Sequence, residues 1–163
     1  MVEFFSDLKR AVVVGVGNEF RGDDYLGVKV VKELSDKLRS RKVLLLNGEN
    51  IPENWVNRII EFRPTHVLLI DAGMVGMKPG QAALVDVEKL TAAPVLSTHA
   101  LPLRVLCELV REVSGARVAV LVIQPKDTSL RRGLTQELEE ASKRITEILL
   151  DVLRRRIESQ PHF

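Results

Sequence analysis

Three polar side chains from separate parts of the chain could together bind a divalent metal ion. Asp24 lies in a glycine-containing turn after an apolar run, Asp71 ends another apolar run, and His99 lies in a polar segment before a helical pattern. Two carboxylates and one imidazole suit a divalent transition ion and leave positions open for water or substrate. No sequence spacing by itself indicates such a metal site, because the side chains come from three different segments.

The turn that carries Asp24 also favours a cation over an anion. A glycine-rich turn from a strand into a helix usually receives an anion, because N–H groups and the helix dipole point into it. Here the chain's own carboxylates take that place, at the end of Gly15-Val16-Gly17-Asn18-Glu19-Phe20-Arg21-Gly22-Asp23-Asp24. A dinucleotide fingerprint fails because Phe20 stands where a third small residue is needed, and the P-loop, G-x-S-x-G and H-E-x-x-H motifs are missing.

Each of these side chains also has a structural interpretation. We expect Asp23 to be a helix N-cap, and Asp24 could merely favour the helix dipole. Asp71 is harder to explain in this way. A carboxylate at the end of the apolar run 67–70 loses solvation free energy unless it is paired with a cation, binds a ligand or stays hydrated. His99 could equally be a ligand or a cap between loop and helix.

The other histidines and the single cysteine are expected to be structural. His66 precedes its strand, which predicts a surface loop at the opposite end of the sheet, and His162 lies in the terminal tail. Cys107 falls in the middle of a helical pattern and should be a small buried apolar side chain. With one cysteine and no CxxC pair, an intrachain disulfide and a structural zinc site of that type are excluded.

The elements that position these side chains alternate between apolar strands and amphipathic helices. We expect strands at 11–16, 43–46, 67–70, 82–87 and 118–123, and helices at 24–38, 52–62, 101–113 and 134–157. Strands that are apolar on both faces are typical of a mostly parallel sheet between helices. We therefore predict an α/β fold, a three-layer α/β/α sandwich. It has a mostly parallel five-stranded sheet with a short edge strand, and residues 1–163 form a single domain.

Function in such sheets lies beyond the carboxyl ends of the strands. Asp24, Asp71 and His99 can all share that edge, together with residues 47–49, Gln124 and Asp127. The net charge of +2 is too small to argue for nucleic acid or a membrane surface as a partner. No apolar run reaches about 18 residues and no signal-peptide pattern begins the chain, so we expect a cytoplasmic protein.

Several short motifs, in this order, resemble those of the [NiFe]-hydrogenase maturation endopeptidases. Together they cover nearly the whole chain and are specific, although each alone would be weak. They are Gly15-Val16-Gly17-Asn18, Gly22-Asp23-Asp24, the segment Asn47 to Glu53, Leu69-Ile70-Asp71-Ala72, Ser97-Thr98-His99-Ala100-Leu101-Pro102-Leu103, Ile123-Gln124-Pro125 and Gly133-Leu134-Thr135.

The resemblance implies a specific activity. That family removes a short C-terminal extension from the large-subunit precursor of [NiFe] hydrogenases after nickel insertion. Its three metal-contacting positions correspond to Asp24, Asp71 and His99, which would be both the metal and the catalytic residues. The nickel would come with the precursor, so no permanent cofactor is expected. Two departures stand out: Tyr25 replaces a frequent glycine, and residues 47–50 read Asn-Gly-Glu-Asn, where Glu49 could join the metal.

The resemblance supplies no serine or cysteine nucleophile, so water should attack the peptide bond. The substrate's nickel could polarise the carbonyl or activate that water, or it could only license docking while Asp71 acts as general base. We expect the apolar setting of Asp71 to raise its pKa. Three alternatives remain open: a metal-independent pair of Asp23 or Asp24 with Asp71, a non-catalytic nickel-checking module, and a nucleotide-binding domain.

Overall fold

A twisted five-stranded sheet forms the centre of the molecule. The computed structural model describes residues 1–49, 52–87 and 100–160. The strands are ordered β2-β1-β3-β5-β4 across the sheet. All neighbours are parallel except β4, which pairs antiparallel with β5 at the edge. The predicted mostly parallel sheet with a short edge strand is confirmed. The strands are β1 (Ala11–Gly15), β2 (Val43–Asn47), β3 (His66–Ala72), β4 (Ala82–Asp86) and β5 (Arg117–Ile123).

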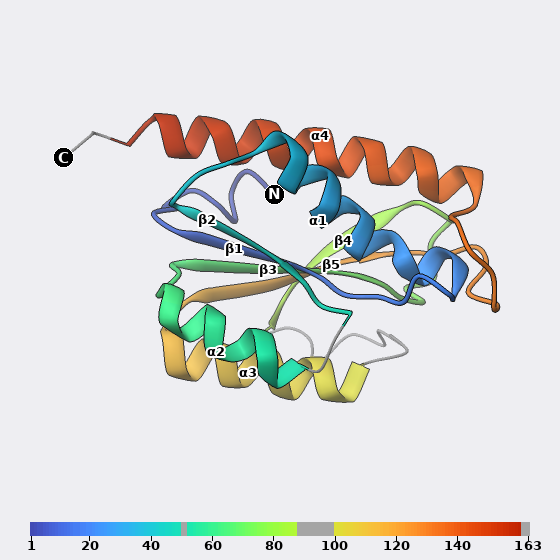
Figure 1. Cartoon of the computed structure of the whole chain (residues 1–163), viewed down its shortest axis with the longest axis horizontal. Helices are drawn as coiled ribbons and strands as arrows, with labels where there is room; N and C mark the ends of the chain where they lie inside the picture. The colour runs from blue at the N-terminus through green and yellow to red at the C-terminus, as the bar shows by residue number, and fades with distance from the viewer. Residues whose placement is uncertain (50–51, 88–99, 161–163) are drawn as a thin grey trace.

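Helices cover both faces of the sheet, which confirms the three-layer sandwich. Helices α1 (Leu26–Lys37) and α4 (Gln136–Glu158) lie on one face, and α2 (Pro52–Phe62) and α3 (Ala100–Ser114) lie on the other (Figure 1). A short 3-10 helix, η1 (Gly22–Tyr25), precedes α1, so the single helix expected at 24–38 begins as this tighter turn. Among the described residues, no helix is long and apolar enough to cross a membrane.

Each face of the sheet builds its own apolar core. Alternate side chains of β1 point to opposite faces, so Val13 joins the core under α1 and α4 while Val12 and Val14 join the core under α2 and α3. The N-terminal residues Phe4 and Phe5 belong to the first core. All five residues of β1 are buried, as expected for a central parallel strand.

Two glycines allow α1 to begin directly against the sheet. A Cβ added to Gly15 would lie 2.3 Å from the carbonyl oxygen of Gly27, and one added to Gly27 would lie 2.2 Å from the carbonyl oxygen of Ile70. Such distances are far inside van der Waals contact, so neither position accepts a side chain without moving the backbone. These glycines therefore set the approach of α1 to β1 and β3, which fixes where η1 and Asp24 lie.

Two predictions about strand β3 were wrong in detail. The strand continues through Asp71, which pairs in register with Val122 of β5, so Asp71 lies within the strand and not after it. His66 is the first residue of β3 and is buried, not in a surface loop. It does lie at the opposite end of the sheet, in register with Ala11. The N-terminal segment covers it, and the ring of Phe4 packs edge-on at 5.3 Å.

Candidate functional site

Asp24 and Asp71 are brought to the carboxyl edge of the two central strands. Asp71 is the penultimate residue of β3 and has no exposed surface, and Asp24 in η1 is 3% exposed. Their segments are joined because η1 packs against β3 and the amide of Val16 donates to the carbonyl of Ile70 at 2.9 Å. Carboxylates are rarely buried so fully outside ion pairs and binding sites. The structure thus supports the predicted placement of both acids at one edge.

The third predicted ligand cannot be placed. His99 lies outside the described residues. Within residues 1–49, 52–87 and 100–160, no three His, Cys, Asp or Glu side chains gather closely enough to hold a metal ion. The set of Asp24, Asp71 and His99 therefore stays a prediction. A contribution from Glu49 to the metal also stays a prediction; its carboxylate accepts a hydrogen bond from the side-chain amide of Asn47 at 3.1 Å.

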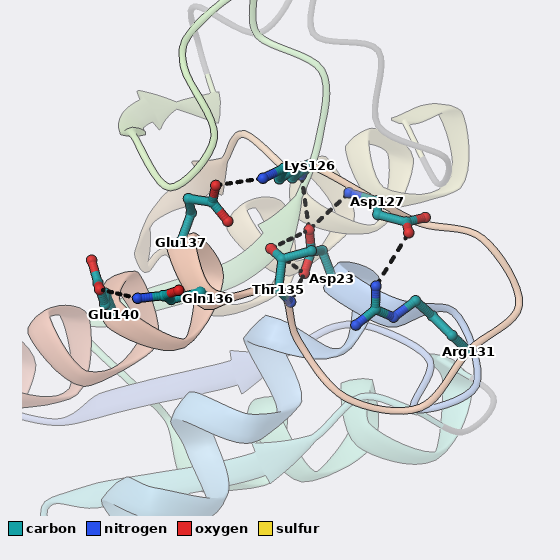
Figure 2. Close-up of polar contacts among 8 residues, drawn as sticks. All are labelled: Asp23, Lys126, Asp127, Arg131, Thr135, Gln136, Glu137 and Glu140. Atoms are coloured by element: carbon teal, nitrogen blue, oxygen red, sulfur yellow. Dashed lines mark hydrogen bonds and ion pairs between the residues drawn. The ribbon is translucent and has the colours of Figure 1, made fainter.

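Asp23 has a different role from the predicted helix N-cap. No side-chain cap bond is made at the start of η1 or of α1. The Asp23 carboxylate instead accepts hydrogen bonds from groups more than 100 residues away (Figure 2). One oxygen accepts from the backbone amides of Lys126 and Asp127 at 2.8 and 2.9 Å, and the other accepts from the Thr135 amide at 2.7 Å. The Thr135 hydroxyl lies 3.0 Å from both oxygens.

These bonds join η1 to the loop between β5 and α4. The carboxylate of Asp23 lies at the N-terminus of α4, where the helix dipole favours a negative charge. Backbone bonds reinforce the junction, since the amide of Asp23 donates to the carbonyl of Asp127 at 2.9 Å. The glycine-rich turn thus carries an anion that is received by another part of the same chain. Asp23 fixes the backbone from which Asp24 projects.

Two further polar residues at this edge also hold loops in place. Gln124 follows β5, is buried, and accepts a hydrogen bond from the amide of Val75 in the loop after β3 at 2.9 Å. Hydrogen bonds from Ser129, and the nearby Arg131 guanidinium, lower the pKa of Asp127. Asp127 therefore remains a carboxylate near neutral pH and is a poor proton donor for catalysis.

Tyr25, which departs from the motif, is accommodated along α1. Its hydroxyl accepts a hydrogen bond from the Lys32 ammonium at 2.9 Å, and this bond raises the pKa of Lys32. The tyrosine thus lies within the η1–α1 junction without interrupting it. Thr135 is the residue whose role the sequence did not reveal. The only signal was its place in Gly133-Leu134-Thr135, directly before a helix.

Comparison with known proteins decides the family. The family model described as hydrogenase maturation protease matches residues 28–152. The curated hydrogenase 3 maturation protease of Escherichia coli K12 is 31% identical over 130 residues, which span 80% of this chain and 82% of that protein. The chain belongs to the hydrogenase maturation protease family.

Solved structures of hydrogenase maturation proteases have the same fold. The [NiFe] hydrogenase maturation protease HycI from Thermococcus kodakarensis KOD1 is 32% identical, with a TM-score of 0.85, covering 94% of this chain and 97% of that one. The solution structure of an endopeptidase HycI from Escherichia coli is 27% identical, with a TM-score of 0.74, covering 87% and 90%. This near-complete overlap confirms the family predicted from the motifs and the α/β architecture predicted from the strand and helix pattern.

Proposed function

We propose that this protein is an endopeptidase that removes the C-terminal extension of a [NiFe]-hydrogenase large-subunit precursor after nickel has been inserted. The observation that carries the proposal is the burial of Asp24 and Asp71 at one edge of the sheet, in a chain of the hydrogenase maturation protease family. Buried carboxylates attract a cation more strongly than exposed ones, because water screens their charge little.

The nickel in this proposal belongs to the substrate. Asp24 and Asp71, with His99, would contact the ion as the precursor docks, and so bring the scissile peptide into register. A precursor without nickel would lack this contact. Nickel-dependent docking then follows from the metal–ligand bonds that only a nickel-loaded precursor could form with these side chains.

The attacking group in this proposal is water. Cys107 is not suited to be a nucleophile, because its burial raises the pKa of its thiol to about 12 and it lies on α3 beneath the sheet. Water would add to the scissile carbonyl carbon, a base would take its proton, and the amine of the extension would leave with a proton. Asp71 is the candidate base if nickel serves only for docking. If nickel polarises the carbonyl or the water, Asp71 is a ligand.

Matched substitutions of neighbouring acids test this assignment. Asp24→Asn removes the charge with little change of shape, and Asp127→Asn makes the same change at a nearby exposed carboxylate. We expect Asp24→Asn to abolish cleavage of a nickel-loaded precursor and to weaken its binding, while Asp127→Asn retains activity. If wild type cleaves the precursor and Asp24→Asn cleaves it equally well, the proposed role of Asp24 is refuted. Stable wild-type binding without any release of peptide would support a checking module.

A further inference from the structure

Two large apolar side chains are exposed beside the candidate site. Phe20 is 49% exposed and Leu130 is 85% exposed, the highest value among the large apolar residues that the structure describes. They come from the turn after β1 and from the loop between β5 and α4. An isolated parallel β-bridge between Arg21 and Arg131 joins these two segments. Phe20 and Leu130 are therefore carried by two segments that this bridge joins.

Positive charge surrounds these apolar side chains. Arg21, Arg131 and Arg132 are all exposed. The guanidinium of Arg132 lies 4.9 Å from the centre of the Phe20 ring, and that of Arg131 lies 3.3 Å from the carboxylate of Asp127. Within the described part of the chain, neither Arg21 nor Arg132 forms an ion pair. The surface formed by Phe20, Arg21, Leu130, Arg131 and Arg132, here called the loop surface, thus combines apolar area with two arginines outside these ion pairs, and Glu19 directly precedes it in the sequence.

The loop surface is rigidly connected to Asp24. The amide of Gly22 donates to the carbonyl of Arg131 at 2.9 Å, and the amide of Arg131 donates to the carbonyl of Phe20 at 3.0 Å. Gly22 is followed by Asp23, whose buried carboxylate accepts three backbone amides, and then by Asp24. A ligand held on the loop surface is therefore held at a fixed position relative to the candidate site.

A cavity extends from the loop surface toward α1 and α4. Its volume is about 250 Å³, enough for one large side chain, and Arg132 lines it. The other lining residues include Tyr25, Lys29 and Leu134, together with the acidic residues Glu19 and Glu139. The lining combines an apolar wall, a phenol and charges of both signs, and the Lys29 ammonium is paired with the Glu139 carboxylate. Such a mixture fits an amino-acid side chain better than a wholly apolar ligand.

We propose that the loop surface binds a peptide segment of the precursor that carries an apolar residue next to an acidic one. The apolar residue packs on Phe20 and Leu130, and the acidic residue pairs with Arg21 or Arg132. Aromatic and arginine side chains are favoured in protein interfaces, and a charge pair at such a rim guides the orientation of the partner. This inference rests on the proposed function, because it names the surface that delivers the scissile bond to Asp24.

Two variants and one matched control test the loop surface. Leu130→Ser removes its most exposed apolar side chain, and Arg132→Glu reverses one of its charges. Leu109→Ser is the control, since Leu109 is a 45% exposed leucine on α3, on the face of the sheet opposite α1 and α4 (Figure 1). We expect both loop variants to weaken binding of the nickel-loaded precursor and to raise KM about tenfold, with kcat little changed, as for residues that contribute to an interface. The control should match wild type.

The outcomes separate this inference from the proposed function. If wild type cleaves the precursor and both loop variants keep the wild-type KM and affinity, the loop surface is refuted and the proposed function stands. If wild type does not cleave, the proposed function fails, and precursor affinity alone still decides whether the loop surface binds it. Loss of a wild-type dimer in Leu130→Ser, measured by sedimentation, would assign the surface to a second copy and overturn the inference.

Discussion

The carboxylate of Asp23 should stabilise the whole carboxyl edge of the sheet, and Asp23→Asn tests this. An amide keeps one acceptor oxygen and replaces the other by a donor. In the less costly orientation, the new NH2 group faces Thr135, whose hydroxyl can rotate to accept from it. The Thr135 amide, now 2.7 Å from the carboxylate, then loses its acceptor in a partly buried position. The hydrogen bonds from the Lys126 and Asp127 amides remain but become weaker, because their acceptor is no longer charged.

These changes define the expected size of the effect. Losing a hydrogen bond to a buried charged group costs about 1.5–3 kcal/mol, and weakening the two remaining bonds adds to it, for about 2–4 kcal/mol in total. At about 2–4 °C per kcal/mol for a domain of this size, the melting temperature should fall by about 4–16 °C. Amide exchange in residues 126–135 should also become faster, because these residues lose their connection to η1.

Thermal unfolding and hydrogen exchange of the purified variants provide the assay. Asp127→Asn is the control, because it removes a charge in the same loop from a solvated carboxylate whose hydrogen bonds, among the described residues, stay within that loop. Its melting temperature should stay close to wild type. An Asp23→Asn protein that melts within 1–2 °C of wild type, with unchanged exchange in residues 126–135, would refute the structural role of Asp23.

Three further predictions concern the core and the glycine junction. Burial, followed by the charge of Arg117, lowers the pKa of His66 in the folded protein. The unfolded chain therefore protonates the His66 imidazole more readily than the folded protein does, and the free energy of unfolding should fall as the pH drops below about 6.5. The melting temperature of His66→Phe should fall less than that of wild type over the same range. Cys107, whose pKa is raised to about 12, should resist alkylation at pH 8 in the native protein and react once urea unfolds it; rapid native reaction would contradict its burial. Gly27→Ala places a Cβ 2.2 Å from a backbone oxygen and should lower stability by about 1–3 kcal/mol or more in urea unfolding, whereas an unchanged midpoint would argue against the close approach of α1 to β3.

The fold could be predicted from the sequence because its apolar patterns are long and regular. The run 118–123 is short, apolar throughout and rich in β-branched residues, which is typical of a strand covered on both faces, and the long 134–157 pattern is typical of an amphipathic helix on a sheet. The end of β3 could not be predicted from hydropathy. The apolar run stops at Ile70, but backbone pairing with β5 continues through Asp71, and strand pairing does not depend on the polarity of one side chain.

The roles of adjacent acids could not be separated from sequence alone. Asp23 and Asp24 are both carboxylates in the same turn, and a local rule makes the first of them a helix cap. The partners that decide the role of Asp23 lie 103 to 112 residues further along the chain, so only the tertiary structure reveals them. The predicted surface position of His66 was wrong for a similar reason. The segment that buries it contains Phe4 and Phe5, which are far from it in sequence.

The most direct test of nickel-dependent processing is the intact mass of a [NiFe]-hydrogenase large-subunit precursor after incubation with the purified protein. Two precursor samples are needed, one loaded with nickel and one without it. We predict that a C-terminal peptide is lost only from the loaded precursor. Cleavage of both samples would contradict nickel sensing by Asp24, Asp71 and His99, and cleavage of neither cognate sample would contradict the proposed peptidase activity.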